Sequence, residues 1–411
     1  MPGSRVPGSR VVGGAIVVVA LLSGCGGSDA LEAWPAKLVG RSAGSQLGLA
    51  GFAVNTPPAV QLLDADSQPI VGAEVTFTVT SGGGSVTGGV ATTGSDGVAT
   101  VGGWSLANGT NTVTASIPAP FRVAPVTFAA SGLSEAFQID LRFLSAMSPS
   151  RQAAFTNAQA QWQQAIYGDI PDITVNVPAG SCNPAVAQTI DDVIIFVVLD
   201  SIDGPGGILA AAGPCYIRGA DKLPLIGLMV FDTADVATLE QSGEFVEVVL
   251  HEMAHVLGFG TIWDPGYLSL LVGSAALGGT DPHFIGTQAL GAFDRIGGTA
   301  YTGGAKVPVE NMGGPGTEDS HWRESVFGNE LMTGYLNAGV PNPLSVVTIA
   351  SFGDEGYRVN YAAAESYSHT FAAPPLRAAP AGRVIALGND VLRLPIYMVD
   401  PAGHITGVYR R

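Results

Sequence analysis

The sequence VEVVLHEMAHVLGFGTIW, residues 246–263, decides how the rest of the chain is interpreted. Its apolar residues recur at helical spacing and predict a helix over residues 244–257. On that helix His251 and His255 lie one turn apart on the same face, so both can bind one metal ion. Glu252 lies beside them and can take a proton from water whose acidity a bound zinc ion increases. Two histidines at this spacing around a glutamate therefore indicate a catalytic zinc helix rather than packing alone.

A catalytic zinc site needs a third protein ligand and one open position. Gly258 allows the chain to leave the helix in a left-handed turn and to bring another ligand beneath the metal. Three residues after Gly258 the chain has Thr261 and not a histidine. The third ligand must therefore come from farther along the chain, and the remaining histidines are His283, His321, His369 and His404.

His321 is the strongest of these candidates because of its surroundings, EDSHWRESVFGNELMTGYL. Met332 follows it by eleven residues, in Asn329-Glu330-Leu331-Met332-Thr333-Gly334, as a metzincin methionine turn would. His283 is the alternative ligand, but no such methionine turn follows it. His369 and His404 lie in a Pro- and Ala-rich tail, where we expect them to be solvated.

The helix motif, His321-Trp322 and the Glu330-Leu331-Met332 turn together resemble the leishmanolysin-type metallopeptidases of the metzincin clan, in their bacterial form. Further matching segments are VFDTADV (230–236), GFGTIW (258–263) and SFGDEGYRVNYAAAESY (351–367). The resemblance covers residues 135–368 and implies that a long insertion, residues 259–320, precedes the third ligand. It implies one catalytic Zn²⁺ on His251, His255 and His321, a Met-turn at Met332, and a zinc-bound water activated by Glu252.

The resemblance raises further expectations. Tyr335 is offset by one position from the tyrosine that some metzincins place near zinc. Three residues either shape the site or pack around it, namely Trp263, Trp322 and Asp319. A peptide substrate is expected to add as a strand, and LIGLMV (225–230) is the candidate partner if it lies at a sheet edge. Eukaryotic relatives are kept latent by a pro-segment cysteine; because this chain has no unpaired cysteine for that role, any latency must work otherwise.

Residues 135–368 also have the pattern of an α/β domain with a mixed sheet. A helix is expected over residues 148–166, with Ser148 as its N-cap and Pro149 in its first turn. The expected strands are 137–144, 173–177, 192–200 and 225–232. Residues 369–411 depart from this pattern, since a Pro/Ala-rich linker is followed by short strand-like pieces to which the sequence assigns no function.

Residues 36–132 predict an all-β sandwich. Apolar residues alternate with threonines in VTFTVT (75–80), as in a half-buried strand, and turn signals at Gly82–Gly84 and Asp96-Gly97 separate it from further strands. This segment resembles the bacterial immunoglobulin-like domains of invasin- and intimin-type surface proteins. The resemblance implies a spacer that holds the next domain away from a membrane.

The N-terminus has the features of a targeting segment. Two arginines precede an apolar run, residues 15–22, that is too short to span a bilayer as a mature helix. Leu22-Ser-Gly-Cys25 resembles a bacterial lipobox, in which Cys25 is lipidated; an ordinary signal peptide with a chance cysteine is the alternative. Residues 1–25 are therefore interpreted as a lipoprotein signal peptide and residues 26–35 as a tether. The expected location is the bacterial cell envelope, at the outer membrane or cell surface, or outside the cell.

Cys182 and Cys215 can form a disulfide in an oxidising compartment, with two free thiols as the alternative. The formal net charge of −16, without any run of Lys or Arg, argues against a nucleic-acid partner. Together these features predict a zinc metalloendopeptidase that acts on proteins or peptides at the cell surface and is anchored to the membrane through Cys25. The alternative is a surface adhesin with an incidental metallopeptidase fold.

Overall fold

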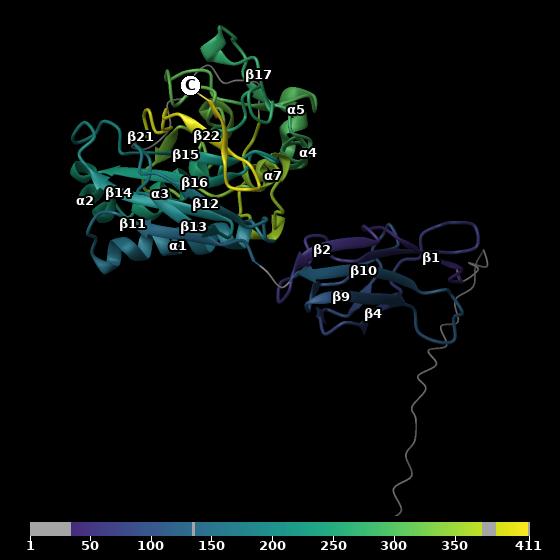
Figure 1. The fold of residues 1–411 in the computed structure, drawn as a ribbon. Coiled ribbons are helices and arrows are strands. Elements are labelled where there is room, and N and C mark those ends of the chain that lie inside the picture. Colours follow the sequence, from purple (N-terminus) through teal and green to yellow (C-terminus); the bar gives the residue numbers. More distant parts are fainter. Residues whose placement is uncertain (1–33, 134–135, 372–383, 410–411) are drawn as a thin grey trace, which may run out of the picture.

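The computed structural model describes residues 34–133, 136–371 and 384–409. The predicted signal peptide, with Cys25, lies outside the described residues. A strand-only region extends to residue 133, and a region that mixes strands and helices follows it (Figure 1). Within the described ranges, no helix combines the length and the apolarity that crossing a bilayer requires.

The first region is built from short strands that share one core. Val60, Val75 and Val113 are fully buried in that core and come from strands of both larger sheets. The sheets have the orders β1-β3-β7, β2-β10-β9-β4-β6 and β5-β8. Their strands are β1 (Lys37–Gly40), β2 (Ser45–Leu49), β3 (Ala59–Leu63), β4 (Glu74–Ser81), β5 (Ser85–Thr87), β6 (Val90–Thr92), β7 (Val98–Thr100), β8 (Gly103–Ser105), β9 (Gly109–Ser116) and β10 (Val126–Leu133).

The second region is organised around a mixed sheet with the order β11-β14-β16-β15-β22-β23. Its strands are β11 (Ile139–Phe143), β14 (Val193–Asp200), β16 (Pro224–Asp232), β15 (Ala210–Arg218), β22 (Ile396–Val399) and β23 (Ile405–Tyr409). β11, β14 and β16 are parallel, β15 is antiparallel to β16, and β22 is parallel to β15. A separate hairpin joins β12 (Ile173–Val177) to β13 (Val186–Ile190).

LIGLMV does not lie at a sheet edge, so the condition under which it could bind a peptide substrate as an added strand is not met. This segment belongs to β16, which is hydrogen-bonded to β14 on one side and to β15 on the other. Its nearly continuous apolar sequence suits an interior strand that is buried on both faces. The C-terminal tail supplies β22 and β23, so the tail extends the main sheet beyond β15.

Three of the longer helices contact the main sheet, and the motif helix is held between one of them and the sheet. The helices are α1 (Pro149–Ala165), α2 (Thr233–Ser242), α3 (Phe245–Leu257), α4 (Thr287–Phe293), α5 (Thr299–Thr302), α6 (Glu324–Phe327) and α7 (Val346–Glu355). Ser148 caps α1 as predicted, with its hydroxyl accepting from the backbone of Arg151 at 3.3 Å. Trp162 of α1 donates from its indole to the carbonyl of Leu250 in α3 at 3.0 Å. A Cβ at Gly227 in β16 would lie 2.3 Å from Val256, so this glycine allows α3 to approach the sheet closely.

The segment between the motif helix and His321 has little regular structure of its own. It contains the short three-stranded sheet β17 (Leu271–Val272), β18 (His283–Phe284) and β19 (Val307–Pro308). Short helical turns at Ala275–Leu277 and Asp294–Gly298 lie in the same segment, and another follows α7 at Tyr361–Ala363. After α6 the chain forms β20 (Tyr335–Asn337), which pairs with β21 (Val384–Ala386) from the tail.

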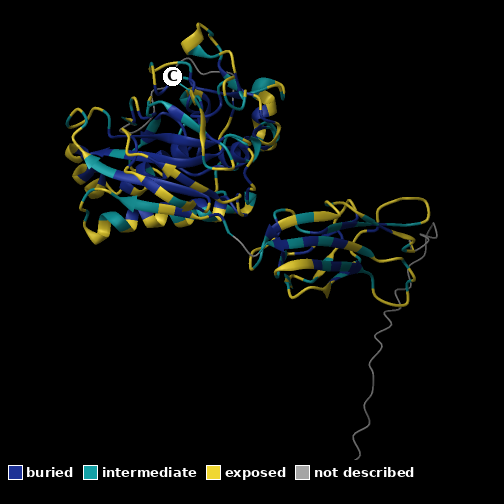
Figure 2. Ribbon diagram, in the orientation of Figure 1, coloured by how far each residue is buried: buried dark blue, intermediate teal, exposed yellow. Residues whose placement is uncertain are grey.

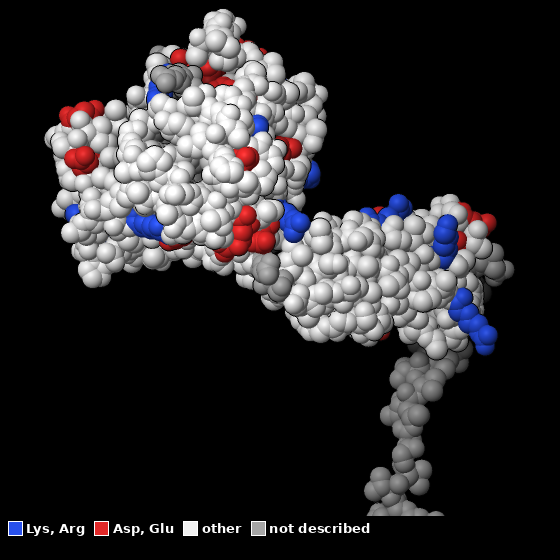
Figure 3. Space-filling model, in the orientation of Figure 1, with Lys and Arg blue, Asp and Glu red and all other residues white. Residues whose placement is uncertain are grey.

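The two regions touch through a few polar contacts. The Tyr167 hydroxyl donates to the carbonyl of Leu47 at 3.0 Å, and the Asn55 amide donates to the carbonyl of Val359 at 2.8 Å. Buried residues are concentrated around the main sheet, whereas the strands of the first region alternate between buried and exposed positions (Figure 2). On the face drawn in Figure 3, the described Lys and Arg side chains are scattered and form no continuous patch.

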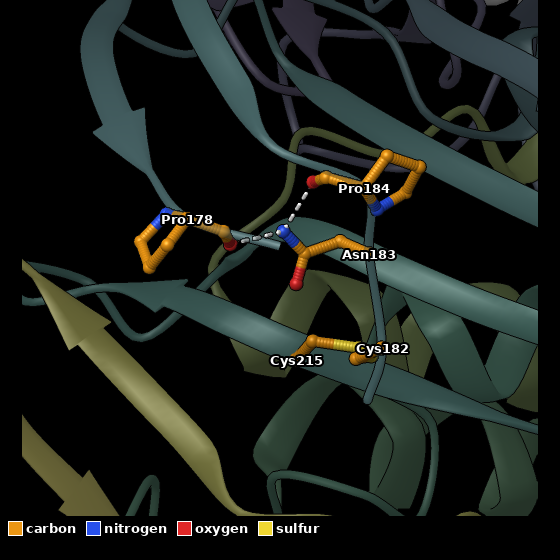
Figure 4. Close-up of a disulfide and its surroundings, with 5 residues drawn as sticks. All are labelled: Pro178, Cys182, Asn183, Pro184 and Cys215. Atoms are coloured by element: carbon orange, nitrogen blue, oxygen red, sulfur yellow. Dashed lines mark hydrogen bonds between the residues drawn. A yellow bond between two sulfur atoms is a disulfide. The ribbon is translucent and has the colours of Figure 1, made fainter. Parts of the chain in front are cut away.

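A disulfide joins Cys182 to Cys215 in β15, with their Cα atoms 6.2 Å apart (Figure 4). Next to it, the Asn183 amide donates to the carbonyls of Pro178 and Pro184 at 3.2 and 2.7 Å. Both cysteines are buried in the core between the β12–β13 hairpin and the sheet. The disulfide therefore ties a loop of that hairpin to β15, the strand that the tail covers.

Candidate metal centre

Three histidines converge at the end of the motif helix. The Nε2 atoms of His251 and His255 are 3.0 Å apart, and the Nε2 atom of His321 lies 3.2 Å from the first and 3.1 Å from the second. All three side chains are completely buried. The helix supplies two of the imidazoles, as the i, i+4 spacing predicts, and the chain returns 66 residues after His255 with the third.

The other ring nitrogen of each histidine fixes which tautomer is present. The Nδ1 atoms of His251, His255 and His321 lie 2.8, 2.8 and 2.9 Å from the carbonyl oxygens of Leu331, Phe259 and Thr317 respectively. Because a carbonyl can only accept, each Nδ1 must carry the proton and each Nε2 must present a lone pair. Three lone pairs that point at one another without a proton between them suit a bound cation, and three imidazoles are a common zinc ligand set.

Burial also favours the neutral ligand form of two of these rings. It lowers the pKa of His251 and lowers the pKa of His255 well below the ordinary value of a histidine. Burial alone would lower the pKa of His321 as well, but the Asp390 carboxylate outweighs it and raises that pKa. Metal binding requires the neutral imidazole, so His251 and His255 are ready to accept a metal over a wide pH range.

Two glycines allow the third histidine to reach the helix. Gly258 ends α3 at a φ of 130°, where a Cβ would lie 2.5 Å from a carboxylate oxygen of Glu355. Gly260 has a φ of 68°, and a Cβ there would lie 2.1 Å from the carbonyl oxygen of Ser320. The chain just after the helix therefore passes against the backbone next to His321, which only glycine permits at this separation.

Backbone pairing and one carboxylate hold the segment that carries His321. The backbone N–H of Glu310 donates to the carbonyl of His321 at 2.8 Å, and that of Asp319 donates to the carbonyl of Glu310 at 2.9 Å. The Asp319 carboxylate accepts from the Ser274 hydroxyl at 2.6 Å and from the backbone of Ala275 at 2.8 Å. Asp319 therefore organises the insertion around the third histidine and lies outside the imidazole cluster.

The predicted methionine turn, around Met332, comes eleven residues after His321. Met332 is completely buried, and its carbonyl accepts from the backbone of Trp322 at 2.9 Å. Glu330 is also buried; its carboxylate accepts from the Met332 backbone at 2.6 Å and from the Ser345 hydroxyl at 2.6 Å. Since the carbonyl of Leu331 holds His251, the buried Glu330 carboxylate fixes a turn on which a histidine depends.

Glu252 is the candidate general base, and it has no partner for its carboxylate. The side chain is completely buried, and neither oxygen has a hydrogen-bond donor among the described residues. Burial raises the pKa of Glu252 well above the ordinary value of a carboxyl group, and the nearby Asp390 carboxylate raises it further. A buried, unpaired carboxylate beside three imidazoles is suited to exchange protons with a water molecule or a substrate.

Asp390, which no sequence motif indicated, lies in the cluster as well. Its Oδ2 atom is 3.1 Å from Nε2 of His321 and 3.4 Å from Nε2 of His251, and the side chain is completely buried. Together with His255 these residues form a group whose ligand atoms could hold one metal ion. Burial alone would raise the pKa of Asp390, but the imidazoles outweigh it and hold that pKa below its ordinary value. No local motif marks this aspartate, because only the folding of the tail brings it to the cluster.

The remaining candidates lie elsewhere. His283 is in β18, with its Nδ1 atom 2.8 Å from the carbonyl of Asp281, and does not belong to the cluster. His369 and His404 are exposed, and Tyr335 belongs to β20, which pairs with the tail. The two tryptophans are completely buried, and their indole groups donate at 2.7 Å from Trp263 to Glu355 and at 2.8 Å from Trp322 to Thr348.

A Gly260→Ala substitution tests the close approach at the helix end. We expect it to lower the free energy of unfolding by roughly 2 kcal/mol or more, because it adds a clash with Ser320 to an unfavourable φ. Gly278→Ala is the matched control, since Gly278 also has a positive φ, of 86°, but has nothing within 4 Å of an added Cβ. Urea denaturation measures the free energy of unfolding of both variants. Equal losses of stability would show that the close approach to Ser320 does not contribute to stability.

Comparison with known proteins gives matches over this region. The model of the leishmanolysin family (peptidase M8) matches residues 151–373. The chain is 30% identical over 166 residues to the ciliated left-right organizer metallopeptidase of Xenopus laevis, covering 37% of this chain and 23% of the relative. It is 31% identical over 179 residues to a leishmanolysin homolog of Crithidia fasciculata (43% and 26%) and 27% identical over 211 residues to leishmanolysin of Leishmania chagasi (50% and 33%). The chain thus matches only about a quarter to a third of the length of these relatives.

Among solved structures, the chain is similar to two segments of intimin. The D00-D0 domain gives a TM-score of 0.18 at 18% identity, covering 22% of this chain and 45% of that one. The D0-D1 domain gives 0.20 at 14% identity, covering 38% and 77%. These scores are too low to establish the fold of the first region. The family match covers more than half of the chain and includes the motif helix, His321 and Met332, so this protein belongs to the leishmanolysin family of metallopeptidases.

Proposed function

We propose that the protein is a zinc-dependent endopeptidase of the metzincin type that hydrolyses peptide bonds in proteins, with Glu252 as its general base. The observation that carries the proposal is the convergence of three buried Nε2 lone pairs beside a buried carboxylate that lacks a donor among the described residues. Membership of a zinc-dependent peptidase family supports the choice of metal.

Each residue has a defined task in this reaction. His251, His255 and His321 would hold the zinc ion, which when bound polarises the scissile carbonyl and makes water more acidic. Glu252 accepts the proton of the attacking water and passes it to the nitrogen of the leaving amine. The raised pKa of Glu252 suits this exchange, because a carboxyl group with a pKa closer to neutrality both takes and returns a proton readily. The buried turn at Met332 keeps His251 in position.

Replacing Glu252 by glutamine tests the general base. We expect the rate of peptide cleavage to fall by about 10²–10⁴-fold, since the isosteric amide cannot accept the proton, while bound zinc stays at the wild-type level. Glu247→Gln on the same helix is the matched control, because its amide oxygen can still accept from Asn342. Cleavage of a mixed peptide library and metal analysis of the same preparations give both readouts. Full activity in the Glu252→Gln variant would rule out this mechanism and leave the adhesin alternative.

The assignment of the third ligand is tested by comparing two histidine variants. We expect His321→Ala to lose most of the zinc that the wild-type protein retains after dialysis, because two imidazoles bind a divalent ion much less tightly than three. His283→Ala should keep wild-type zinc, since His283 lies outside the cluster. Plasma mass spectrometry of the dialysed proteins measures the metal content. The reverse pattern would make His283 the ligand and the rival interpretation correct.

We further propose that the protein is exported and anchored to the bacterial envelope by lipid on Cys25, with the strand-only region as an immunoglobulin-like spacer. Support comes from the lipobox-like sequence and from a first region whose two larger sheets share one core. We expect Cys25→Ser to move the protein from the membrane fraction to the soluble fraction, because the acyl chains attach to the thiol. Fractionation of cells with immunoblotting measures the shift; an unchanged membrane fraction would contradict the anchor.

A further inference from the structure

The part of the tail that precedes β22 crosses the imidazole cluster; residues 384–392 are called here the crossing segment. It begins as β21, which pairs antiparallel with β20 next to the methionine turn. The backbone of Leu387 then donates to the carbonyl of Gly334 at 3.2 Å, and the Thr317 hydroxyl donates to the carbonyl of Gly388 at 2.5 Å. Thr317 is also the residue whose carbonyl holds His321, so the segment is attached directly beside a histidine.

The other end of the crossing segment is attached to the main sheet. The backbone N–H of Ala212 in β15 donates to the carbonyl of Asp390 at 2.7 Å, and the backbone N–H of Leu392 donates to the carbonyl of Ala212 at 2.9 Å. Val391 therefore forms a parallel β-bridge with Ala212, a single step of the backbone pairing by which many proteins bind an extended peptide. Between its two attachments the segment passes over the cluster, where Asp390 points its carboxylate at the histidines.

The crossing segment closes the site. Leu387 is 1% exposed, Val391 is 3% exposed, and Asp390 is fully buried, so these side chains are packed inside the protein. The same is true of Glu252 and of each of the three histidines, which have no exposed surface. A peptide bond cannot reach these groups in this arrangement. The crossing segment lies directly against them and must move before a substrate can bind.

The groups around the Asp390 carboxylate indicate that it binds a cation. Its Oδ2 atom faces the Nε2 atoms of His251 and His321, whose protons are on the opposite ring nitrogens. A carboxylate oxygen and imidazole nitrogens at 3.1–3.4 Å attract one another when a proton or a metal cation lies between them, and the convergence of three imidazoles with this carboxylate suits a metal cation. Carboxylate oxygen is a good zinc ligand, and zinc with four protein ligands lacks the open position that catalysis needs.

We propose that the crossing segment is an intramolecular inhibitor and that Asp390 is the fourth ligand of the zinc ion, in the position that water takes in an active peptidase. This inference rests on the proposed zinc site. The enzyme is latent while the segment is seated and becomes active when the segment leaves. Asp390 lies outside the residues that the family model matches, so the proposed inhibitory segment is part of the tail and not of the matched peptidase region.

The experiment uses the full-length chain with two substitutions at Asp390, to Ala and to the isosteric Asn. Asn389→Ala is the matched control, because Asn389 is the neighbouring residue and its side chain is exposed. Leu387→Ala is an independent variant that loosens the packing of the segment without changing any proposed ligand. Thermal unfolding confirms that each variant is folded, and metal analysis gives its zinc content.

The first readout does not depend on catalysis. Acetohydroxamate binds zinc only where a coordination position is free, and its dissociation constant is measured by titration calorimetry. We expect both Asp390 variants to retain one zinc and to bind acetohydroxamate at least about tenfold more tightly than the wild type, because the competing ligand is removed. Leu387→Ala should shift in the same direction, and Asn389→Ala should match the wild type. Cleavage of the peptide library should rise in the same order.

Three results would overturn the inference. Loss of zinc from the folded Asp390 variants would make Asp390 an obligatory ligand of a structural site. Unchanged acetohydroxamate affinity in zinc-loaded Asp390 variants would show that the carboxylate does not occupy the open position. If those variants fail to fold, an unchanged affinity in Leu387→Ala would exclude inhibition by the segment. By contrast, absence of zinc from every protein, including the wild type, would contradict the proposed function itself.

Discussion

The site depends on three hydrogen bonds in which an imidazole N–H is held by a backbone carbonyl. Leu331, Phe259 and Thr317 supply these carbonyls, and they come from the methionine turn, the loop after the helix and the end of the insertion. Each bond fixes a tautomer and a ring orientation at once. The three loops must therefore be correctly placed before three lone pairs can converge, and much of the surrounding structure serves that placement.

Buried carboxylates contribute to this placement. Asp319 accepts from the backbone of the insertion, and Glu330 accepts from the methionine turn. Away from these loops, Asp232 accepts in the same way from the backbone N–H groups of residues 202–204, after β14. A carboxylate that gathers several backbone donors stabilises an irregular loop that no ladder of backbone bonds can hold. The acidic composition of the chain, with 34 acidic and 18 basic residues, is thus partly structural and not only a matter of solubility.

The sequence predicted those features that have a local signal. Helical spacing and a capping serine predicted α1, and the HExxH pattern predicted α3. The His–Trp and Glu–Leu–Met segments indicated His321 and Met332. The sequence predicted the strand β16 but left its place in the sheet open, and its continuous apolar run suits the interior position that it occupies. Asp390 could not be found in this way. It is one aspartate in a tail without periodicity, and its position follows from backbone pairing with β15 and β20, which are distant in sequence.

The strand β15 carries both the disulfide and the backbone groups that pair with the tail. Its sequence contains Gly213 and Pro214, which weaken any prediction of a strand, yet β15 is buried along its whole length and pinned by the disulfide at Cys215. The tail pairs with its outer edge at Ala212 and again at Tyr216–Arg218, so the edge is covered at both of these places. Pairing with β16 and the disulfide at Cys215 hold β15 independently of the crossing segment. The same backbone groups that hold Asp390 over the histidines then become available to an extended peptide, so a single displacement would free both the metal position and the surface on which a substrate strand can align.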